Sequence, residues 1–232
     1  MPRQSRGTAT SVTTLLVPPT SSWSDDEQSR DVIVHFRTGE VIFAQRQEAD
    51  CVYVILDGKV KIDCHAADGR ACTFAVMGAG DIIGEVPMHD GRRHASRALA
   101  LTAVRAMAQN RARFHAQLAA DPSSADDLLR VLARRIRRTS EDIVDVMSTD
   151  LVARVAKQLL RLAQRFGDQH DGGTRLTLDL NQEEFAQLVG TSRESVNRAL
   201  SEFVANGWIR VDRDAITIVD LQPLVHRLGG SH

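Results

Sequence analysis

The sequence lacks the features that would assign it to several specialised classes of protein. It has three cysteines, Cys51, Cys64 and Cys72, an odd number without zinc-site spacing. A disulfide framework and a four-cysteine iron-sulfur cluster are therefore not supported. No run approaches the roughly 18 apolar residues of a membrane-spanning helix, so we expect no membrane partner. The formal net charge of −1 gives no overall attraction to nucleic acid, so any DNA-binding site must be argued from local geometry.

Signals of catalysis are missing as well. The chain has no phosphate loop of the G-x-x-x-x-G-K kind, no metal-ligand cluster and no nucleophile paired with a base. We therefore expect a protein that is not an enzyme and holds no metal. No pattern favours a haem on His35, His65 or His89.

What is present is an ordinary globular composition, 43% hydrophobic and 25% charged over 232 residues. This length favours two domains, and no segment has the apolar core of a signal peptide, so we expect a cytoplasmic protein. Residues 1–30, rich in Ser, Thr and Pro, are predicted to form a flexible tail.

Residues 31–122 consist of short runs typical of strands, separated by glycine, and predict an antiparallel β-roll that serves as a sensor domain. Two Asp-Gly pairs, Asp57-Gly58 and Asp68-Gly69, predict tight hairpins. With a two-residue turn at the second pair, Cys64 would lie opposite Thr73, so that Cys64 and Cys72 would face opposite sides of the sheet.

Residues 123–149 predict a long dimerisation helix and hinge. Apolar residues recur at intervals of three and four, the spacing of a coiled-coil seam, at Leu129, Leu132, Ile136, Ile143 and Val146. A helix packed on its own domain is the alternative. Thr139 also lies on the seam beside Ser140, where each hydroxyl needs either a polar ligand or the carbonyl one turn back.

Residues 150–232 predict a winged helix-turn-helix domain. Asn181 with Glu184 and Thr191 with Glu194 have the capping-box spacing, so two short helices would meet at Gly190. In such a motif the second helix enters the DNA major groove with its first turns against the bases. A plain helical hairpin with a solvated face is the other interpretation.

The polar residues of that second helix suit DNA. Arginine can donate two hydrogen bonds to guanine and glutamate can accept one from cytosine, so Arg193, Glu194 and Arg198 can read G·C pairs. Serine hydroxyls and a helix N-terminus suit phosphate oxygens. The predicted DNA-binding residues are Ser192, Arg193, Glu194, Ser195, Asn197 and Arg198.

These three regions, in this order, resemble the cyclic-AMP receptor protein and FNR superfamily of bacterial transcription regulators, especially actinobacterial members. "LVGTSRESVNRAL" is similar to the recognition helix of the family and "VLARRIRRTSEDI" to its dimer helix. The resemblance implies an α+β fold, a homodimer, a near-palindromic double-stranded DNA site, cyclic AMP as the ligand and RNA polymerase as a further partner.

The resemblance also implies a ligand site around "GEVPMHDGRRHAS". Gly84 and Glu85, followed by Val86, match the pair that meets the ribose, and Thr139 and Ser140 match the pair that touches the purine. His94 and Ala95 stand where the family has a phosphate-binding arginine and a hydroxyl residue. We therefore expect cyclic-AMP binding that is weak or absent, unless a bulge brings Arg93 and Ser96 inward.

Two alternatives to this function remain open from the sequence. The chain could be a cyclic-nucleotide-binding module that regulates a protein partner through its C-terminal helices. Its sensor could instead respond to modification of a single thiol, with His65 helping Cys72 to ionise.

Overall fold

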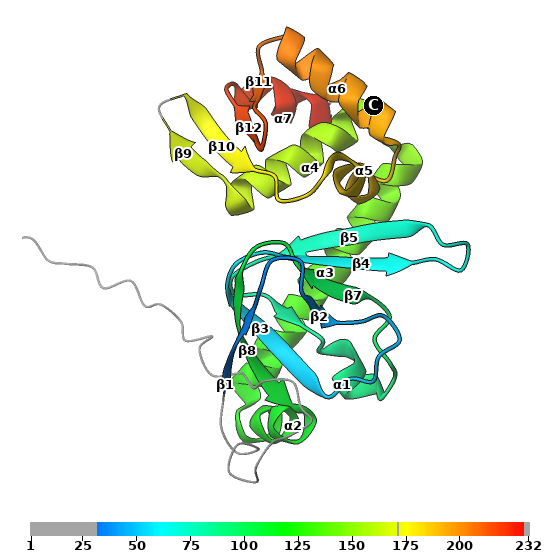
Figure 1. The fold of residues 1–232 in the computed structure, drawn as a ribbon, viewed down its shortest axis with the longest axis vertical. Helices are drawn as coiled ribbons and strands as arrows, with labels where there is room; N and C mark the ends of the chain where they lie inside the picture. Colours follow the sequence, from blue (N-terminus) through cyan, green and yellow to red (C-terminus); the bar gives the residue numbers. More distant parts are fainter. Residues whose placement is uncertain (1–31, 171, 230–232) are drawn as a thin grey trace, which may run out of the picture. The chain divides into compact units, whose positions relative to one another are not determined.

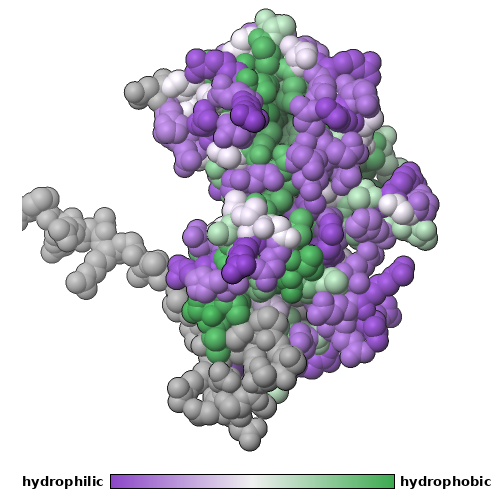
Figure 2. All heavy atoms as spheres, in the orientation of Figure 1, coloured by the Kyte–Doolittle hydropathy of each residue, from purple (hydrophilic) through white to green (hydrophobic). Residues whose placement is uncertain are grey.

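The computed structural model describes residues 32–170 and 172–229. Two compact units are present, one made of residues up to 62 together with 76–122, the other of residues 63–75 together with the chain from 123 onward. Figure 1 shows strands gathered in the first unit and helices with a small sheet in the second. On the face drawn in Figure 2, apolar side chains reach the surface among polar ones in both units.

Two four-stranded sheets make up the N-terminal β-structure. Their strand orders are β1-β8-β3-β6 and β2-β7-β4-β5, and every pairing with a recorded register is antiparallel. The strands are β1 (Val32–Phe36), β2 (Val41–Phe43), β3 (Cys51–Asp57), β4 (Val60–His65), β5 (Ala71–Met77), β6 (Ile82–Ile83), β7 (Arg97–Ala100) and β8 (Val104–Asn110). β3 is buried along its first five residues because it lies between β8 and β6.

The prediction of a hairpin at Asp57-Gly58 is wrong. β3 and β4 belong to different sheets, so this turn carries the chain from one sheet to the other. Gly58 has φ of 90°, and a Cβ there would lie 2.3 Å from the carbonyl oxygen of Ala103. Only glycine fits this corner.

The hairpin between β4 and β5 exists, but its predicted register is also wrong. The N–H of Ala66 donates to the carbonyl of Arg70 at 2.8 Å, and the N–H of Gly69 donates to the carbonyl of Ala66 at 3.0 Å. The loop therefore holds three residues instead of two, with Gly69 at φ of 83°. One extra loop residue shifts the pairing by one, so Cys64 lies opposite Cys72 and not opposite Thr73.

Short helices complete the first unit and a long one begins the second. α1 (Val86–Asp90) starts directly after Glu85, and α2 (Arg111–Ala120) is capped by the side chain of Asn110. α3 (Pro122–Ser148) has 27 residues, of which only Leu128 is buried. The predicted seam is exposed in the single chain, with Ile136 68% exposed and Ile143 56% exposed.

The rest of the second unit is a winged helix-turn-helix. It contains α4 (Leu151–Phe166), β9 (Asp168–His170), β10 (Gly173–Thr177), α5 (Gln182–Val189), α6 (Arg193–Ala205), β11 (Ile209–Val211), β12 (Ala215–Ile218) and α7 (Leu221–Gly229). α4 packs against α5, α6, α7 and β10, and its side chains Val155, Ala156 and Leu159 are fully buried. The predicted fold class is thus confirmed.

Ion pairs join α4 to the C-terminal half of α3. The Lys157 ammonium lies 2.5 Å from the Asp145 carboxylate, and both side chains are mostly buried. Arg161 pairs with Asp142 and, at 3.2 Å, with Glu141. These partly desolvated pairs fix where α4 begins relative to the end of α3.

Candidate nucleic-acid interface and ligand pocket

Local hydrogen bonds define both helices of the helix-turn-helix. Asn181 and Glu184 form a complete capping box at the start of α5. Gly190 ends that helix in the left-handed conformation at φ of 76°. The predicted capping box of Thr191 with Glu194 is wrong by one residue, because Ser192 caps α6 by accepting from the N–H of Ser195. Capping of this kind contributes about 1 kcal/mol per helix end, so the tight turn follows from residues adjacent in sequence.

α6 divides cleanly into a buried face and an exposed face. Val196, Ala199 and Phe203 are each no more than 2% exposed and pack into the unit. The opposite face carries Arg193, Glu194 and Arg198, all of them exposed, and Asn197, which is partly exposed. The first turns of α6 therefore present a polar surface that the core does not use.

Two of these side chains are held by short contacts. The Nε of Arg193 donates to the side-chain oxygen of Gln182 at 2.8 Å, and Arg198 donates to the hydroxyl of Ser195 at 3.2 Å. Gln182 was not predicted from the sequence, although its place as the first residue of α5 puts it beside the start of α6. It orients the guanidinium of Arg193 and leaves the two terminal nitrogens for a bidentate contact.

Glu194 is ionised at this helix start. Its pKa is lowered first by a hydrogen bond from its own backbone N–H, then by the Ser192 hydroxyl and the two neighbouring arginines. A carboxylate at that position can only accept hydrogen bonds, as recognition of a cytosine amino group requires.

The strands β11 and β12 form the predicted wing. Their antiparallel pairing runs from Ile209 opposite Ile218 to Val211 opposite Ile216. At the tip, Arg175 on β10 lies 3.0 Å from Asp212 and 3.8 Å from Asp214. This pairing neutralises the two tip carboxylates, which would otherwise repel phosphate, and Arg213 between them is exposed.

In the first unit, three residues of the predicted ligand site come together. Gly84 has φ of 80°, and a Cβ there would lie 3.5 Å from the His94 ring and 3.0 Å from the carbonyl oxygen of Cys51. Glu85 is 1% exposed and His94 is 4% exposed. Gly84 therefore lies beside the His94 ring, and Gly84, Glu85 and His94 are all buried.

The His94 ring is packed as an apolar group. It stacks on Phe43 with ring centroids 3.9 Å apart and planes 9° from parallel. The backbone N–H of His94 donates to Gln47, and its carbonyl accepts from Arg46. Burial lowers the pKa of His94 against a smaller opposing effect of Asp50, so the ring is neutral near pH 7. The sequence did not predict Phe43 as its partner.

The neighbouring residues of the predicted site point elsewhere. Arg93 is exposed, and it pairs with Glu48 at 2.6 Å and with the carbonyl of Arg46 at 3.2 Å. Val86 is 54% exposed at the start of α1, Ala95 is exposed and Ser96 is half-buried. The inward turn of Arg93 that would replace the missing arginine is thus not adopted here.

Thr139 and Ser140 lie in the second unit, on α3. Their hydroxyls donate to the carbonyls of Arg135 and Ile136 at 3.1 and 3.0 Å, one turn back along the helix. The sequence left open whether these hydroxyls bond a polar ligand or the carbonyl one turn back, and in the single chain they bond the carbonyls. Both side chains remain exposed on the seam.

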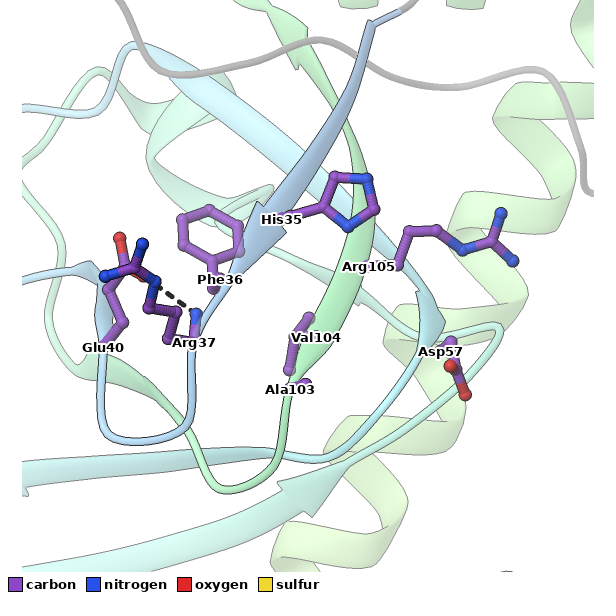
Figure 3. A pocket seen from close by; sticks show the side chains of 8 residues that line it. All are labelled: His35, Phe36, Arg37, Glu40, Asp57, Ala103, Val104 and Arg105. Atoms are coloured by element: carbon purple, nitrogen blue, oxygen red, sulfur yellow. Dashed lines mark hydrogen bonds between the residues drawn. The ribbon is translucent and has the colours of Figure 1, made fainter.

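An open hollow of about 760 Å³ lies elsewhere on the first unit. Figure 3 shows His35 and Arg105 on neighbouring strands, with Arg37 and Glu40 on one side of the view and Asp57 on the other. The backbone N–H of Arg37 donates to the Glu40 carboxylate at 2.8 Å. The lining of this hollow includes none of Gly84, Glu85 and His94.

Neither a metal site nor a membrane span is found within residues 32–170 and 172–229. No group of three or more His, Cys, Asp or Glu side chains there is arranged to hold a metal ion. No helix in the same ranges has both the length and the apolar character needed to cross a membrane.

Comparison with known proteins matches both units to characterised families. The cyclic nucleotide-binding domain model matches residues 33–121, and the Crp-like helix-turn-helix domain model matches residues 153–227. The chain is 46% identical over 194 residues to the CRP-like cAMP-activated global transcriptional regulator of Mycobacterium tuberculosis, covering 84% of this chain and 87% of that protein. It is 27% identical to the cyclic AMP receptor protein of Thermus thermophilus, covering 78% and 80%.

Solved structures show the same fold. A CRP/FNR-family transcriptional regulator from Thermus thermophilus superposes with a TM-score of 0.72 at 25% identity, covering 87% of this chain and all of that one. FixK2 from Bradyrhizobium japonicum has a TM-score of 0.75 at 22% identity, covering 85% and 96%.

Proposed function

Because this chain belongs to the CRP/FNR family of transcription regulators, with a cyclic nucleotide-binding domain and a DNA-binding helix-turn-helix, we propose that it binds a near-palindromic DNA site as a homodimer. The observation that carries this proposal is the exposed polar face at the start of α6, where Arg193, Glu194 and Arg198 are not used by the core. Ser192, Ser195 and Asn197 would add contacts to phosphates and base edges.

The exposed seam of α3 supports the dimer. Leu129, Ile136, Ile143 and Val146 are each more than half exposed in the single chain, at the spacing of a two-helix interface. An apolar stripe of this kind is stable in water once a second copy covers it. A twofold axis would place two recognition helices about one helical turn of DNA apart, so each half-site is read by one α6.

Cyclic AMP is the ligand named for the mycobacterial and Thermus relatives, and we propose that this chain binds it weakly or not at all. A phosphate diester needs a fixed positive charge or several donors, whereas His94 is a neutral ring packed against Phe43. A neutral imidazole offers one donor, and an arginine offers a charged fork. DNA binding would then depend little on the nucleotide, with Thr139 and Ser140 keeping their backbone partners.

The remaining parts of the proposed function follow the family. The protein would act in the cytoplasm by binding DNA without catalysing a reaction, and RNA polymerase would be a further partner. We place the β-roll in residues 31–122, the dimerisation helix and hinge in 123–149, and the winged helix-turn-helix in 150–232. The predicted tail, residues 1–30, lies outside the described residues.

Fluorescence anisotropy with a selected duplex tests the DNA-reading surface. We expect Arg193→Ala to reduce the preference for the selected site over random DNA by about 1 to 3 kcal/mol, roughly five- to 150-fold, while the protein stays dimeric. Gln182→Ala should lose less, because the guanidinium remains and only its orienting contact is removed. Arg92→Ala, an exposed arginine of the first unit, is the matched control and should bind as the wild type does. An unchanged preference in Arg193→Ala would refute the proposal.

A further inference from the structure

The β4–β5 hairpin places two cysteines opposite each other. The loop is closed by the pair Ala66 and Arg70, with Gly69 in the left-handed conformation directly before Arg70. One step along each strand, His65 ends β4 and Ala71 begins β5. The next step brings Cys64 opposite Cys72, so their side chains leave the same face of the hairpin.

Burial of the neighbouring pair agrees with this register. Asp63 and Thr73, the next residues along the two strands, are 1% and 3% exposed and share the inner face. Cys64 is half-buried and Cys72 is exposed, as residues on the outer face should be. The pKa of Cys64 is raised by burial and then by Cys72 itself, which is a second sign that the two thiols are close.

We propose that Cys64 and Cys72 form a redox-sensitive dithiol that closes to an intramolecular disulfide. Alternation along the hairpin makes Cys64 and Cys72 a hydrogen-bonded pair, whose Cα atoms lie about 5.5 Å apart in antiparallel sheets. That separation falls within the roughly 4.4 to 6.8 Å that a disulfide spans. Both cysteines carry free thiols in the structure.

The third cysteine does not compete for this reaction. Cys51 is 1% exposed on β3, in the other sheet, opposite Asn110 of β8. Burial raises the pKa of its thiol far above the ordinary value, which leaves it unreactive.

With hydrogen peroxide as the oxidant, the roles of the two thiols differ. The exposed Cys72 thiolate attacks one peroxide oxygen, the O–O bond breaks, and a sulfenic acid forms on Cys72 while the other oxygen leaves as water. The sulfur of Cys64 then attacks the Cys72 sulfur, the S–O bond breaks, and a second water leaves with the proton of the Cys64 thiol. Two thiols and one peroxide thus give one disulfide and two waters, and an external thiol reverses the closure by exchange.

Thiol counting by intact mass on the full chain tests this site. After brief treatment with equimolar hydrogen peroxide and quenching with a maleimide in denaturant, we expect the wild type to lose two of its three alkylatable thiols. The unalkylated mass should fall by two hydrogens, and peptide mapping should join the peptides of Cys64 and Cys72. Dithiothreitol should restore all three thiols.

Single substitutions assign the two roles. In Cys64→Ser, Cys72 should stop at a sulfenic acid that dimedone traps, whereas Cys72→Ser should keep both remaining thiols under the same treatment. Both substitutions lie on the outer face of the hairpin, and an unchanged circular dichroism spectrum shows that each variant is folded. Three intact wild-type thiols after peroxide, a link to Cys51, or a disulfide between two chains on a non-reducing gel would each overturn the proposal.

Discussion

Replacing His94 with arginine is the most direct test of how the ligand pocket works. The wild-type ring is 4% exposed, stacks on Phe43 at 3.9 Å and is neutral because burial lowers its pKa. An arginine at the same place keeps a flat group over the Phe43 ring, where a cation is favourable. It also adds a permanent charge beside Gly84 and Glu85.

The expected gain follows from the difference between a neutral and a charged donor. A charge-assisted hydrogen bond to phosphate is worth about 1.5 to 3 kcal/mol, so His94→Arg should tighten cyclic-AMP binding about ten- to a hundredfold. Burying that charge costs desolvation free energy even with acidic groups such as Glu85 and Asp50 nearby. The variant without ligand should therefore melt at a lower temperature than the wild type, and saturating cyclic AMP should recover more of that loss than it does for the wild type.

Isothermal titration calorimetry with cyclic AMP measures the affinity, and differential scanning fluorimetry measures the two melting temperatures. His94→Gln is the control, because it offers neutral donors of similar reach without a charge, and it should bind no better than the wild type. Tight binding by the wild type, or an affinity that His94→Arg leaves unchanged, would refute the idea that the neutral ring limits binding.

Three further predictions concern other parts of the chain. The buried His94 should make the free energy of unfolding depend on pH. Its pKa in the folded protein lies below the unfolded value of about 6.5, so on acidification the unfolded chain binds the proton first. The stability present above about pH 6.5 should therefore fall as the pH is lowered. Thermal melts from about pH 7.5 to 5.5, the range that brackets this unfolded value, should show a smaller loss for His94→Phe, which keeps the stack, and equal losses in the two proteins would exclude His94 as the cause. Ile136→Asp should give a monomer by light scattering, because a charge on the seam cannot be covered by a second helix, whereas Arg137→Asp beside it should stay dimeric; a dimeric Ile136→Asp would place the interface elsewhere. Asp150→Ala removes the cap that accepts from two N–H groups of α4 at 3.1 and 3.3 Å, so urea unfolding should lose about 1 kcal/mol, and no loss would mean that packing alone fixes the start of this helix.

The C-terminal half of the molecule follows closely from sequence. Asn181, Glu184, Gly190 and Ser192 act on groups within a few residues of themselves, so the ends of α5 and α6 are determined locally. The long seam of α3 is equally local, because its three-and-four spacing depends only on helical periodicity. These elements were predicted with their positions nearly as the structure has them.

The β-roll was predicted as a class of fold but not in its pairings. Two Asp-Gly pairs look alike in sequence, yet Asp57-Gly58 turns the chain between two sheets and Asp68-Gly69 closes a hairpin with one extra residue. β3 lies between β6 and β8, and neither of these strands is next to it along the chain. Local sequence therefore does not determine the neighbours of β3. Register depends on a single glycine conformation, and a shift of one residue exchanges the two faces of a strand.

The sequence by itself determined that this chain carries a helix-turn-helix with a polar second helix, an apolar seam on α3 and a histidine at residue 94, since each is set by residue identity and short-range spacing. Only the tertiary structure decided that this histidine is buried and neutral against Phe43, that Arg93 turns out toward Glu48, and that Cys64 faces Cys72. Those outcomes depend on which distant strands pack together, because burial and strand register are properties of contacts and not of neighbours along the chain.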